Sequence, residues 1–159
     1  QLGELVSRGG NVMTGYWNRP EATESTIVDG WMHTGDIVRV DDAGRIHIVD
    51  RTKDIIIRGG ENISSLEVEG VLAAAPTVLE AAVIAVPDDV MGEKVGAVVF
   101  GGEDDVDVDA VIAHCKENLA DFKIPQYVSI AKEPLPRNAG GKLLKAKLRE
   151  SAEWGAPLR

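Results

Sequence analysis

Residue types with binding or catalytic chemistry follow one another between positions 36 and 60. They are a carboxylate, an arginine, a lysine and two glycines: Asp36, Arg51, Lys53, Gly59 and Gly60. A carboxylate can accept hydrogen bonds from both hydroxyls of a ribose, and the planar fork of an arginine can bind ribose oxygens or a phosphate. The stretch therefore indicates a nucleotide site if the chain brings Asp36 and Arg51 together. The alternative is an exposed surface ion pair, which contributes well under ~1 kcal/mol.

A β-hairpin between Asp36 and Arg51 would bring the two side chains together. Residues 41–44, Asp-Asp-Ala-Gly, have the composition of a turn, and residues 45–48, Arg-Ile-His-Ile, alternate in polarity as a half-buried strand does. Because antiparallel strands pair across such a turn, the sequence predicts that Arg51 returns to Asp36.

A second lysine, Lys142, follows a Pro- and Gly-rich segment over residues 134–141 that favours neither helix nor strand. A lysine on such a loop is a point charge that can neutralise an oxyanion or an α-phosphate in a transition state. The alternative is an exposed lysine at the start of a basic, amphipathic helix over residues 142–150.

Gly59 and Gly60 follow the apolar run 55–57 and would let an extended ligand lie against exposed backbone at a strand end. An ordinary turn is the alternative, since the pair matches neither a dinucleotide fingerprint nor a phosphate loop. Cys115 lies on the apolar face of a predicted helix and is expected in the core. The three histidines have no metal-ligand spacing, so no metal site is predicted.

The elements after residue 60 predict one layered domain. Ser64 and Glu67 have the spacing of a capping box before a helix, and Asp107 or Asp109 can cap a second one. Strands are predicted over 78–86, 94–100 and 127–130. This order predicts an α+β or open α/β layer domain over 53–150, preceded by β-strand and hairpin segments over 1–52 and followed by a flexible tail over 151–159.

Composition excludes several classes of partner. The net charge of -9 argues against nucleic acid or an anionic membrane surface. The apolar runs are too short to span a bilayer, and no signal-peptide pattern is present. A single cysteine fits a reducing compartment, so we expect the cytoplasm.

Nearly the whole chain, in order, resembles the C-terminal part of the adenylate-forming superfamily, which holds acyl-CoA synthetases, firefly luciferase and peptide-synthetase adenylation domains. The matching stretches are 15–23, 30–31 with 34–36, 50–54, 59–63, 67–69, 87–88 with 92–93, 122–125, and 136–138 with 141–142. The Gly-Gly-Glu-Asn form at 59–62 is most similar to fatty-acyl or aryl CoA ligases. The resemblance implies an α+β lid domain preceded by the end of a large N-terminal domain.

The resemblance also implies the reaction. A carboxylic acid attacks the α-phosphate of ATP to give an acyl-adenylate and pyrophosphate, and coenzyme A then takes the acyl group and releases AMP. Mg²⁺ is expected to arrive with ATP, without ligands among the residues named here.

Residue roles follow by the same resemblance. Asp36 would hold the ribose hydroxyls, Arg51 would assist at the ribose or phosphate, and Lys142 would stabilise the adenylation transition state. Lys53 matches the hinge of the small domain and is also expected near the nucleotide, as is Asn62.

For coenzyme A, the resemblance implies that Gly59 and Gly60 line the pantetheine tunnel. The sequence departs from many members at Ser65, where they carry proline.

The phosphate loop and acyl pocket of the family's large domain have no counterpart in these residues. We therefore expect the missing N-terminal domain as the main partner, no adenylation by the 159-residue chain alone, and possible self-association through the faces left exposed. Two alternatives stay open. One is an adenylation domain that loads a carrier protein, and the other is a stand-alone, non-catalytic binding module.

Overall fold

The computed structural model describes residues 2–102 and 105–158. The chain forms two compact units, Gln1–Lys53 and Asp54–Arg159. The division falls one residue after the expected boundary at 52, and the assignment of the units to a large and a small domain stays a prediction.

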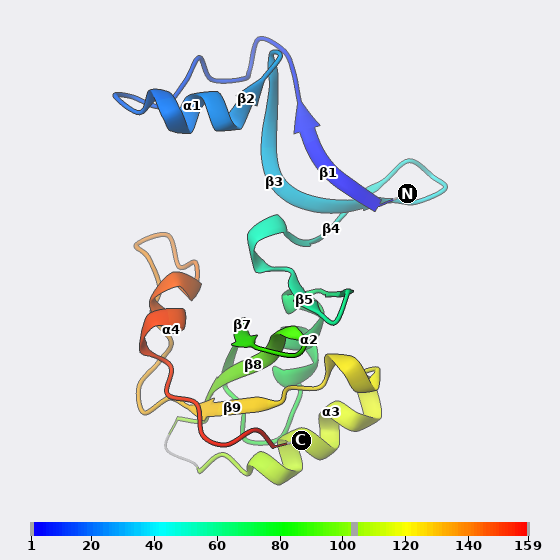
Figure 1. The fold of residues 1–159 in the computed structure, drawn as a ribbon, viewed down its shortest axis with the longest axis vertical. Coiled ribbons are helices and arrows are strands. Elements are labelled where there is room, and N and C mark those ends of the chain that lie inside the picture. Colours follow the sequence, from blue (N-terminus) through cyan, green and yellow to red (C-terminus); the bar gives the residue numbers. More distant parts are fainter. Residues whose placement is uncertain (1, 103–104, 159) are drawn as a thin grey trace. The chain divides into compact units, whose positions relative to one another are not determined.

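The first unit is an antiparallel sheet with one short helix (Figure 1). Strand β3 pairs with β1, β2 and β4. Its elements are β1 (Leu2–Ser7), α1 (Pro20–Thr26), β2 (Ile27–Val28), β3 (Trp31–Val40) and β4 (Ile46–Arg51), followed by the 3-10 helix η1 (Thr52–Asp54).

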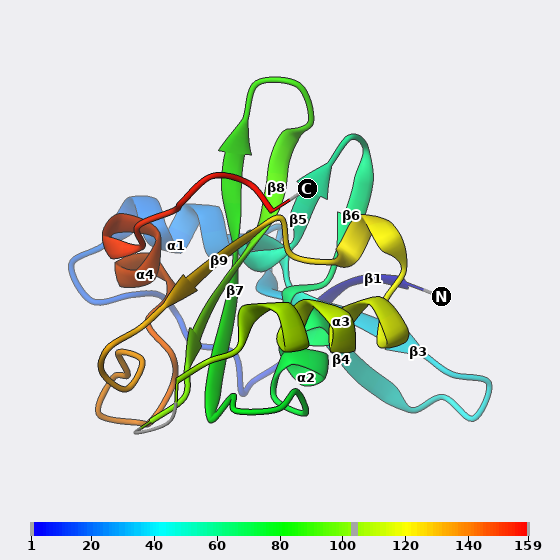
Figure 2. The same cartoon turned by 90° about the horizontal axis from the view of Figure 1, so that it is seen from below.

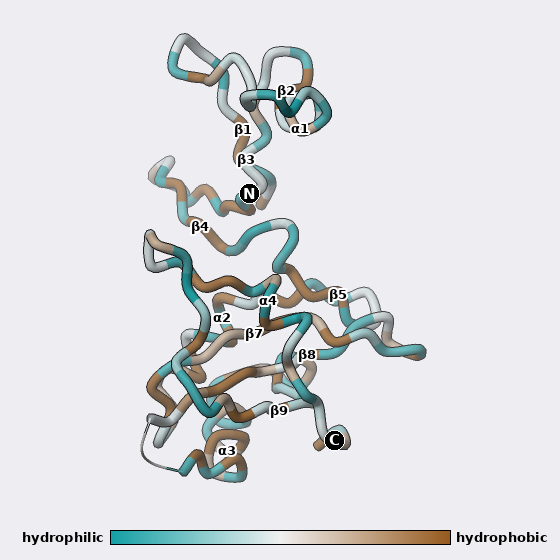
Figure 3. Tube along the Cα trace, turned by 90° about the vertical axis from the view of Figure 1, so that its left-hand side faces the viewer, coloured by the Kyte–Doolittle hydropathy of each residue, from teal (hydrophilic) through white to brown (hydrophobic). Residues whose placement is uncertain are grey.

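The predicted β3–β4 hairpin is confirmed, with a turn organised by Asp41. Its Oδ1 accepts hydrogen bonds from the backbone N–H groups of Ala43 and Arg45, at 3.0 and 2.9 Å. The prediction of a half-buried strand is wrong, because Ile46 and Ile48 are both exposed, at 56% and 64%. This apolar stretch of β4 is coloured brown in Figure 3, and no second layer of the first unit covers it among the described residues.

The second unit is a five-stranded sheet with helices on both faces. The strand order is β6-β5-β8-β7, and β9 pairs in parallel with β8. Its elements are β5 (Ile56–Arg58), β6 (Glu61–Ile63), α2 (Ser65–Leu72), β7 (Glu80–Asp88), β8 (Gly92–Phe100), α3 (Val108–Asn118), η2 (Asp121–Lys123), β9 (Tyr127–Ile130) and α4 (Lys145–Ser151).

Alternating side chains of β7 and β8 fill two cores. Val83 and Val99 point into the larger core beneath α2 and α3, whereas Ile84 and Val98 point into the smaller core beneath α4. Figure 2 shows α2 and α3 side by side, with α4 apart from them across β7. Burial of each such side chain contributes about 1.5–3 kcal/mol relative to exposure, so the sheet is a rigid platform for the loops around it.

Local signals in the sequence correspond to the observed starts of α2 and α3. Ser64 caps α2 by accepting a hydrogen bond from the Glu67 N–H, and Asp107 caps α3 through Ala110. Cys115 is buried on α3, as predicted, and this burial raises the pKa of its thiol to about 11.

Two predictions near the C-terminus differ from the structure. Helix α4 begins at Lys145 rather than at residue 142, since the carbonyl of Lys142 accepts a hydrogen bond from Asn138 within a loop. The tail after α4, which was expected to be flexible, instead contacts the second unit. Trp154 packs against Tyr127 with ring centroids 6.0 Å apart, and the Leu158 N–H donates to the Gln126 carbonyl. The α+β fold, with a central sheet flanked by helices and preceded by strand and hairpin segments, is as predicted.

Candidate functional site

The hairpin of the first unit brings Asp36 and Arg51 together. The two residues are opposite one another in the β3–β4 register, and Arg51 Nε lies 3.0 Å from Asp36 Oδ1. Arg51 Nη2 also donates to the Thr34 carbonyl at 2.9 Å, which fixes the plane of the guanidinium. The side chains of Asp36 and Arg51 are 29% and 49% exposed, so both keep polar atoms available to a ligand.

Glu4 of β1 holds the strand segment that presents Asp36. Glu4 Oε1 accepts the Gly35 N–H at 3.0 Å, and Glu4 Oε2 lies 2.8 Å from His33 Nδ1. These contacts lower the pKa of the Glu4 carboxyl, with the His33 hydrogen bond as the largest cause and the Gly35 N–H next. Gly35 has a φ of 72°, a conformation that glycine adopts without strain. Sequence reasoning missed Glu4, because nothing local marks a partner 29 residues away.

Gly59 and Gly60 form the two-residue turn between β5 and β6. Their φ values are 57° and 91°, as a type I′ hairpin turn requires. The turn is held from the side by the β7–β8 connection, where the Met91 carbonyl accepts the Gly59 N–H at 2.8 Å. Both glycines are exposed, so the backbone edge at this turn is accessible to a ligand.

The predicted residues Lys53 and Asn62 lie near element ends. Lys53 is exposed in η1 and is the last residue of the first unit. Asn62 is exposed in β6, where it pairs with Ile57. Their proposed roles at the hinge and the nucleotide stay predictions.

Lys142 is presented on a short, hydrogen-bonded loop. Its backbone N–H donates to Asn138 Oδ1 at 3.0 Å, and its carbonyl accepts the Asn138 N–H at 2.9 Å. Its side chain is exposed, and within residues 2–102 and 105–158 its ammonium group has no hydrogen bond or ion pair. The charge is therefore available to an incoming anion.

The structure brings some predicted residues together and separates others. Asp36 and Arg51 meet in the first unit, whereas Lys142, Gly59, Gly60 and Asn62 belong to the second. Within the second unit, the loop before α4 and the β5–β6 hairpin lie on different sides in both Figure 1 and Figure 2.

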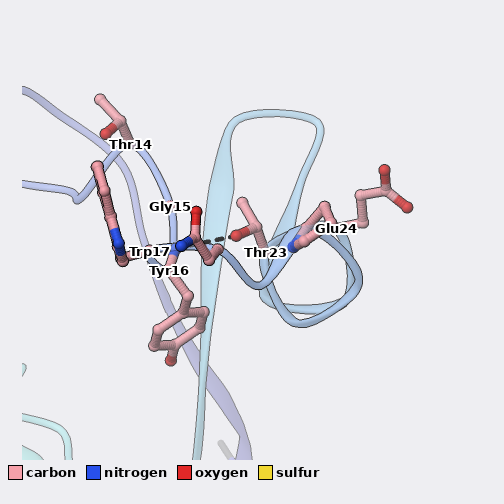
Figure 4. Close-up of a pocket in the computed structure, with 8 residues that line it drawn as sticks. Thr14, Gly15, Tyr16, Trp17, Thr23 and Glu24 are labelled. Carbon is pink, nitrogen blue, oxygen red and sulfur yellow. Dashed lines mark hydrogen bonds between the residues drawn. The ribbon is translucent and has the colours of Figure 1, made fainter.

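A pocket of the first unit lies away from these residues (Figure 4). It has a volume of about 410 Å³ and is lined by residues 14–18, Pro20, Thr23 and Glu24. Thr23 Oγ1 accepts a hydrogen bond from the Tyr16 N–H at 2.9 Å, which connects two residues that line this pocket. None of the predicted site residues lines it.

The described residues contain neither a cluster of metal-ligating side chains nor a helix suited to a membrane. Among residues 2–102 and 105–158, no group of three or more His, Cys, Asp or Glu side chains is placed to hold a metal ion. In the same residues, no helix has the length and apolar character needed to cross a membrane.

Comparison with known proteins identifies the family. Residues 67–142 match the AMP-binding enzyme C-terminal domain. This segment of the chain belongs to this family. The resemblance to adenylate-forming enzymes predicted from the sequence is thereby confirmed.

Similar curated proteins are CoA ligases. A long-chain-fatty-acid–CoA ligase of Mycobacterium tuberculosis is 44% identical over 155 residues, covering 98% of this chain and 31% of the relative. A 2-succinylbenzoate–CoA ligase of Bacillus cytotoxicus is 47% identical over 152 residues, covering 95% of this chain and 31% of the relative. The chain thus spans about a third of the length of the curated relatives it matches.

Solved structures agree with this assignment. The o-succinylbenzoate CoA synthetase of Bacillus subtilis, in complex with its acyl-adenylate intermediate, superposes with a TM-score of 0.85 at 38% identity, over 98% of this chain and 32% of the synthetase. ATP-bound MatB from Rhodopseudomonas palustris superposes with a TM-score of 0.84 at 40% identity, over 94% of this chain and 30% of MatB.

Proposed function

We propose that this chain is the C-terminal part of an ATP-dependent acyl-CoA ligase. In the proposed reaction, a carboxylate oxygen attacks the α-phosphorus of ATP, and pyrophosphate leaves. The thiol of coenzyme A then attacks the acyl carbon, the thioester forms and AMP leaves. A fatty acid is the proposed substrate, because a relative that matches 98% of the chain is a long-chain-fatty-acid–CoA ligase.

The first half-reaction assigns chemistry to three side chains. Asp36 accepts hydrogen bonds from the ribose hydroxyls of ATP, and Arg51 donates to the ribose or a phosphate. Lys142 stabilises the negative charge that develops on the α-phosphate oxygens. The exposed, unpaired ammonium of Lys142 among the described residues supports this role, since no internal ion pair has to break first.

The second half-reaction uses an edge of the second unit that differs from the side carrying Lys142. Gly59 and Gly60 offer exposed backbone to the pantetheine arm of coenzyme A, and Asn62 lies near the nucleotide. Lys53 is the pivot. This division of labour is supported by the position of the Lys142 loop and the Gly59-Gly60 turn on different sides of the second unit (Figures 1 and 2). One unit can then serve two steps by presenting each side in turn.

The substrates, the partner domain and the compartment of the whole protein are part of the same proposal. ATP and coenzyme A are its substrates, and Mg²⁺ arrives with ATP. An N-terminal adenylation domain of the same polypeptide is the partner that supplies the phosphate loop and acyl pocket, and without it the chain does not adenylate. The cytoplasm is the proposed compartment, in keeping with the one buried, unbridged thiol, Cys115.

Coenzyme A is favoured over a carrier-protein thiol as the acyl acceptor. The single observation that carries the proposal is 44–47% identity to CoA ligases over at least 95% of the chain, with the Asp36–Arg51 pair formed. A non-catalytic binding module would have no use for an exposed lysine on a braced glycine loop.

The test is acid-dependent thioester formation by the full polypeptide that contains this chain. The protein is incubated with ATP, Mg²⁺, coenzyme A and a panel of fatty and aryl acids, and acyl-CoA and AMP are measured by mass spectrometry. Acyl-CoA formed with equimolar AMP supports the proposal. Adenylate without thioester, or thioester only on an added carrier protein, contradicts it.

A further inference from the structure

The loop that carries Lys142 is closed by its own hydrogen bonds. The Gly141 N–H donates to the Asn138 carbonyl at 2.9 Å, and the Leu144 N–H donates to the Pro136 carbonyl at 2.8 Å. Arg137, at the N-terminal end of the loop, forms an ion pair with Glu80 of β7, and its Nη2 lies 2.8 Å from Glu80 Oε2. The side chain of Arg137 is 45% exposed, so this tie is open to water and weak. The direction of Lys142 therefore depends on what fixes the other end of the loop.

That other end is fixed by Lys145, the first residue of α4. Lys145 Nζ donates to Glu69 Oε1 and to Ser65 Oγ, both at 2.7 Å. The side chains of Lys145 and Glu69 are only 12% and 13% exposed. An ion pair with so little water around it holds its geometry far better than a surface pair does.

Glu69 joins three elements through one carboxylate oxygen. Besides Lys145 of α4, Glu69 Oε1 accepts the backbone N–H of Val83 at 2.8 Å. Of the described strands, β7 pairs with β8 alone, so this N–H lies on a sheet edge and has no strand partner there. Glu69 thereby links α2, on one face of the sheet, with the β7 edge and with α4, on the other face.

A second ion pair holds the same side of α4. Arg149 follows Lys145 by four residues, a spacing that places both on one helix face. Arg149 Nη2 lies 2.7 Å from Oδ1 of Asp54, the first residue of the second unit. Lys147, between the two cations, is exposed. Besides the buried Leu148, the helix is thus anchored through Lys145 and Arg149 and not through Lys147.

We infer that Lys145, held by Glu69, is a positioning residue that fixes the Lys142 loop against the sheet. Lys145 itself touches no reacting atom in this scheme, and it acts through Leu143 and Leu144, the two residues that connect it to Lys142. Its effect on the reaction rests on the proposed function, whereas its effect on the loop does not.

Hydrogen exchange in this chain tests the inference without reference to activity. Lys145→Met removes the ammonium and keeps a long apolar side chain, and Lys147→Met is the matched control on the same helix. In Lys145→Met we expect the amides of Gly141, Lys142 and Leu144 to exchange roughly tenfold faster. The loss of the Lys145–Glu69 ion pair makes the loop open more often and breaks the hydrogen bonds of these amides. Unchanged exchange in Lys145→Met, or an equal increase in Lys147→Met, overturns the inference.

Glu69→Gln keeps an oxygen acceptor for the Val83 N–H and removes the charge opposite Lys145. The same loop amides must exchange faster in this variant, and it decides alone if Lys145→Met does not fold. Lys145→Arg, which restores a cation at this position, must return the exchange rates toward those of the native chain.

Half-reaction kinetics add a second readout in the ligase. Lys145→Met is expected to slow adenylate formation roughly tenfold to a hundredfold, since small misplacements of a catalytic group are costly. Thioester formation from supplied adenylate is expected to persist, and Lys145→Arg to recover adenylation. Equal losses in both half-reactions would refute the positioning role. A native protein that forms no adenylate refutes the proposed function instead, and the exchange measurement then decides the inference by itself.

Discussion

Single side chains decide whether a nucleotide can be held by the first unit. Asp36 and Arg51 meet at 3.0 Å and both stay partly exposed, so the pair can open toward ribose hydroxyls without uncovering a buried charge. The sequence predicted this meeting, because a short hairpin leaves the register few choices. It did not predict the Glu4 carboxylate that binds His33 and Gly35, since that contact depends on the pairing of β1 with β3.

Asp36→Asn tests the ribose role. The amide keeps the shape but loses the charge and one acceptor, and hydrogen bonds to charged groups contribute about 1.5–3 kcal/mol. We expect KM for ATP in the full ligase to rise roughly tenfold or more, with KM for coenzyme A unchanged. Asp42→Asn, in the exposed turn of the same hairpin, is the control. A normal KM for ATP in Asp36→Asn would contradict the role.

Gly59→Ala tests the turn that is proposed to meet coenzyme A. At φ 57° an alanine costs about 1–2 kcal/mol, and its Cβ would lie 2.5 Å from Met91 Cε, which must move aside. Gly44→Ala has a similar φ of 76° with nothing within 4 Å of the Cβ, so urea unfolding should show a similar loss of stability for both. Only Gly59→Ala should slow the thioester step. A slow thioester step in Gly44→Ala as well would contradict the account.

At the scale of elements, local signals were sufficient for some boundaries, whereas the strands predicted over 78–86 and 94–100 are observed over Glu80–Asp88 and Gly92–Phe100. The Ser64 cap, the Asp107 cap and the strand over 127–130 follow from neighbours within a few residues. The start of α4 was misjudged, because Asn138 binds both the N–H and the carbonyl of Lys142 and keeps this residue in a loop. The Lys145–Glu69 pair could not be predicted, since it joins side chains 76 positions apart that only the sheet brings together.

The β7–β8 connection predicts a pH dependence of stability. Asp88 Oδ2 lies 2.7 Å from Lys94 Nζ, and Asp88 Oδ1 accepts the N–H groups of Met91 and Val90. The Lys94 hydrogen bond, followed by the Met91 N–H, lowers the pKa of Asp88 from 3.8 to about 2. Because the folded-state pKa is depressed, this stabilisation is complete above pH 3.8 and is lost as the pH falls toward about 2.

Asp88→Asn should therefore lower the urea midpoint near neutral pH and reduce its further decline between about pH 4 and pH 2. Some decline should remain, because the pKa of Asp41 is also lowered to about 2, mainly by the hydrogen bond from His47. Asp89→Asn, next to it and exposed, is the control. If the urea midpoint of Asp88→Asn declines at low pH as steeply as that of the native chain, the Asp88 contacts do not contribute this stability.

At the scale of the whole molecule, the second unit carries the Lys142 loop and the Gly59-Gly60 turn on different sides. The sequence predicted the α+β class and the family from motifs spread over nearly its full length, and the family match over residues 67–142 bears this out. The acid substrate was beyond reach, because the pocket that selects it has no counterpart in these 159 residues. The relatives include a long-chain-fatty-acid–CoA ligase and a 2-succinylbenzoate–CoA ligase. The acid in their names therefore differs, while the segment that matches this chain stays similar.

The proposed role of Lys142 in the adenylation step of an acyl-CoA ligase can be tested by acid-dependent exchange of pyrophosphate into ATP, measured on the full polypeptide. We expect exchange in the native protein and in Lys147→Ala, and a loss of about 10²–10³-fold in Lys142→Ala, the size associated with removing one stabilising charge or donor. Native exchange in Lys142→Ala, or no acid-dependent exchange in the native protein, would contradict it.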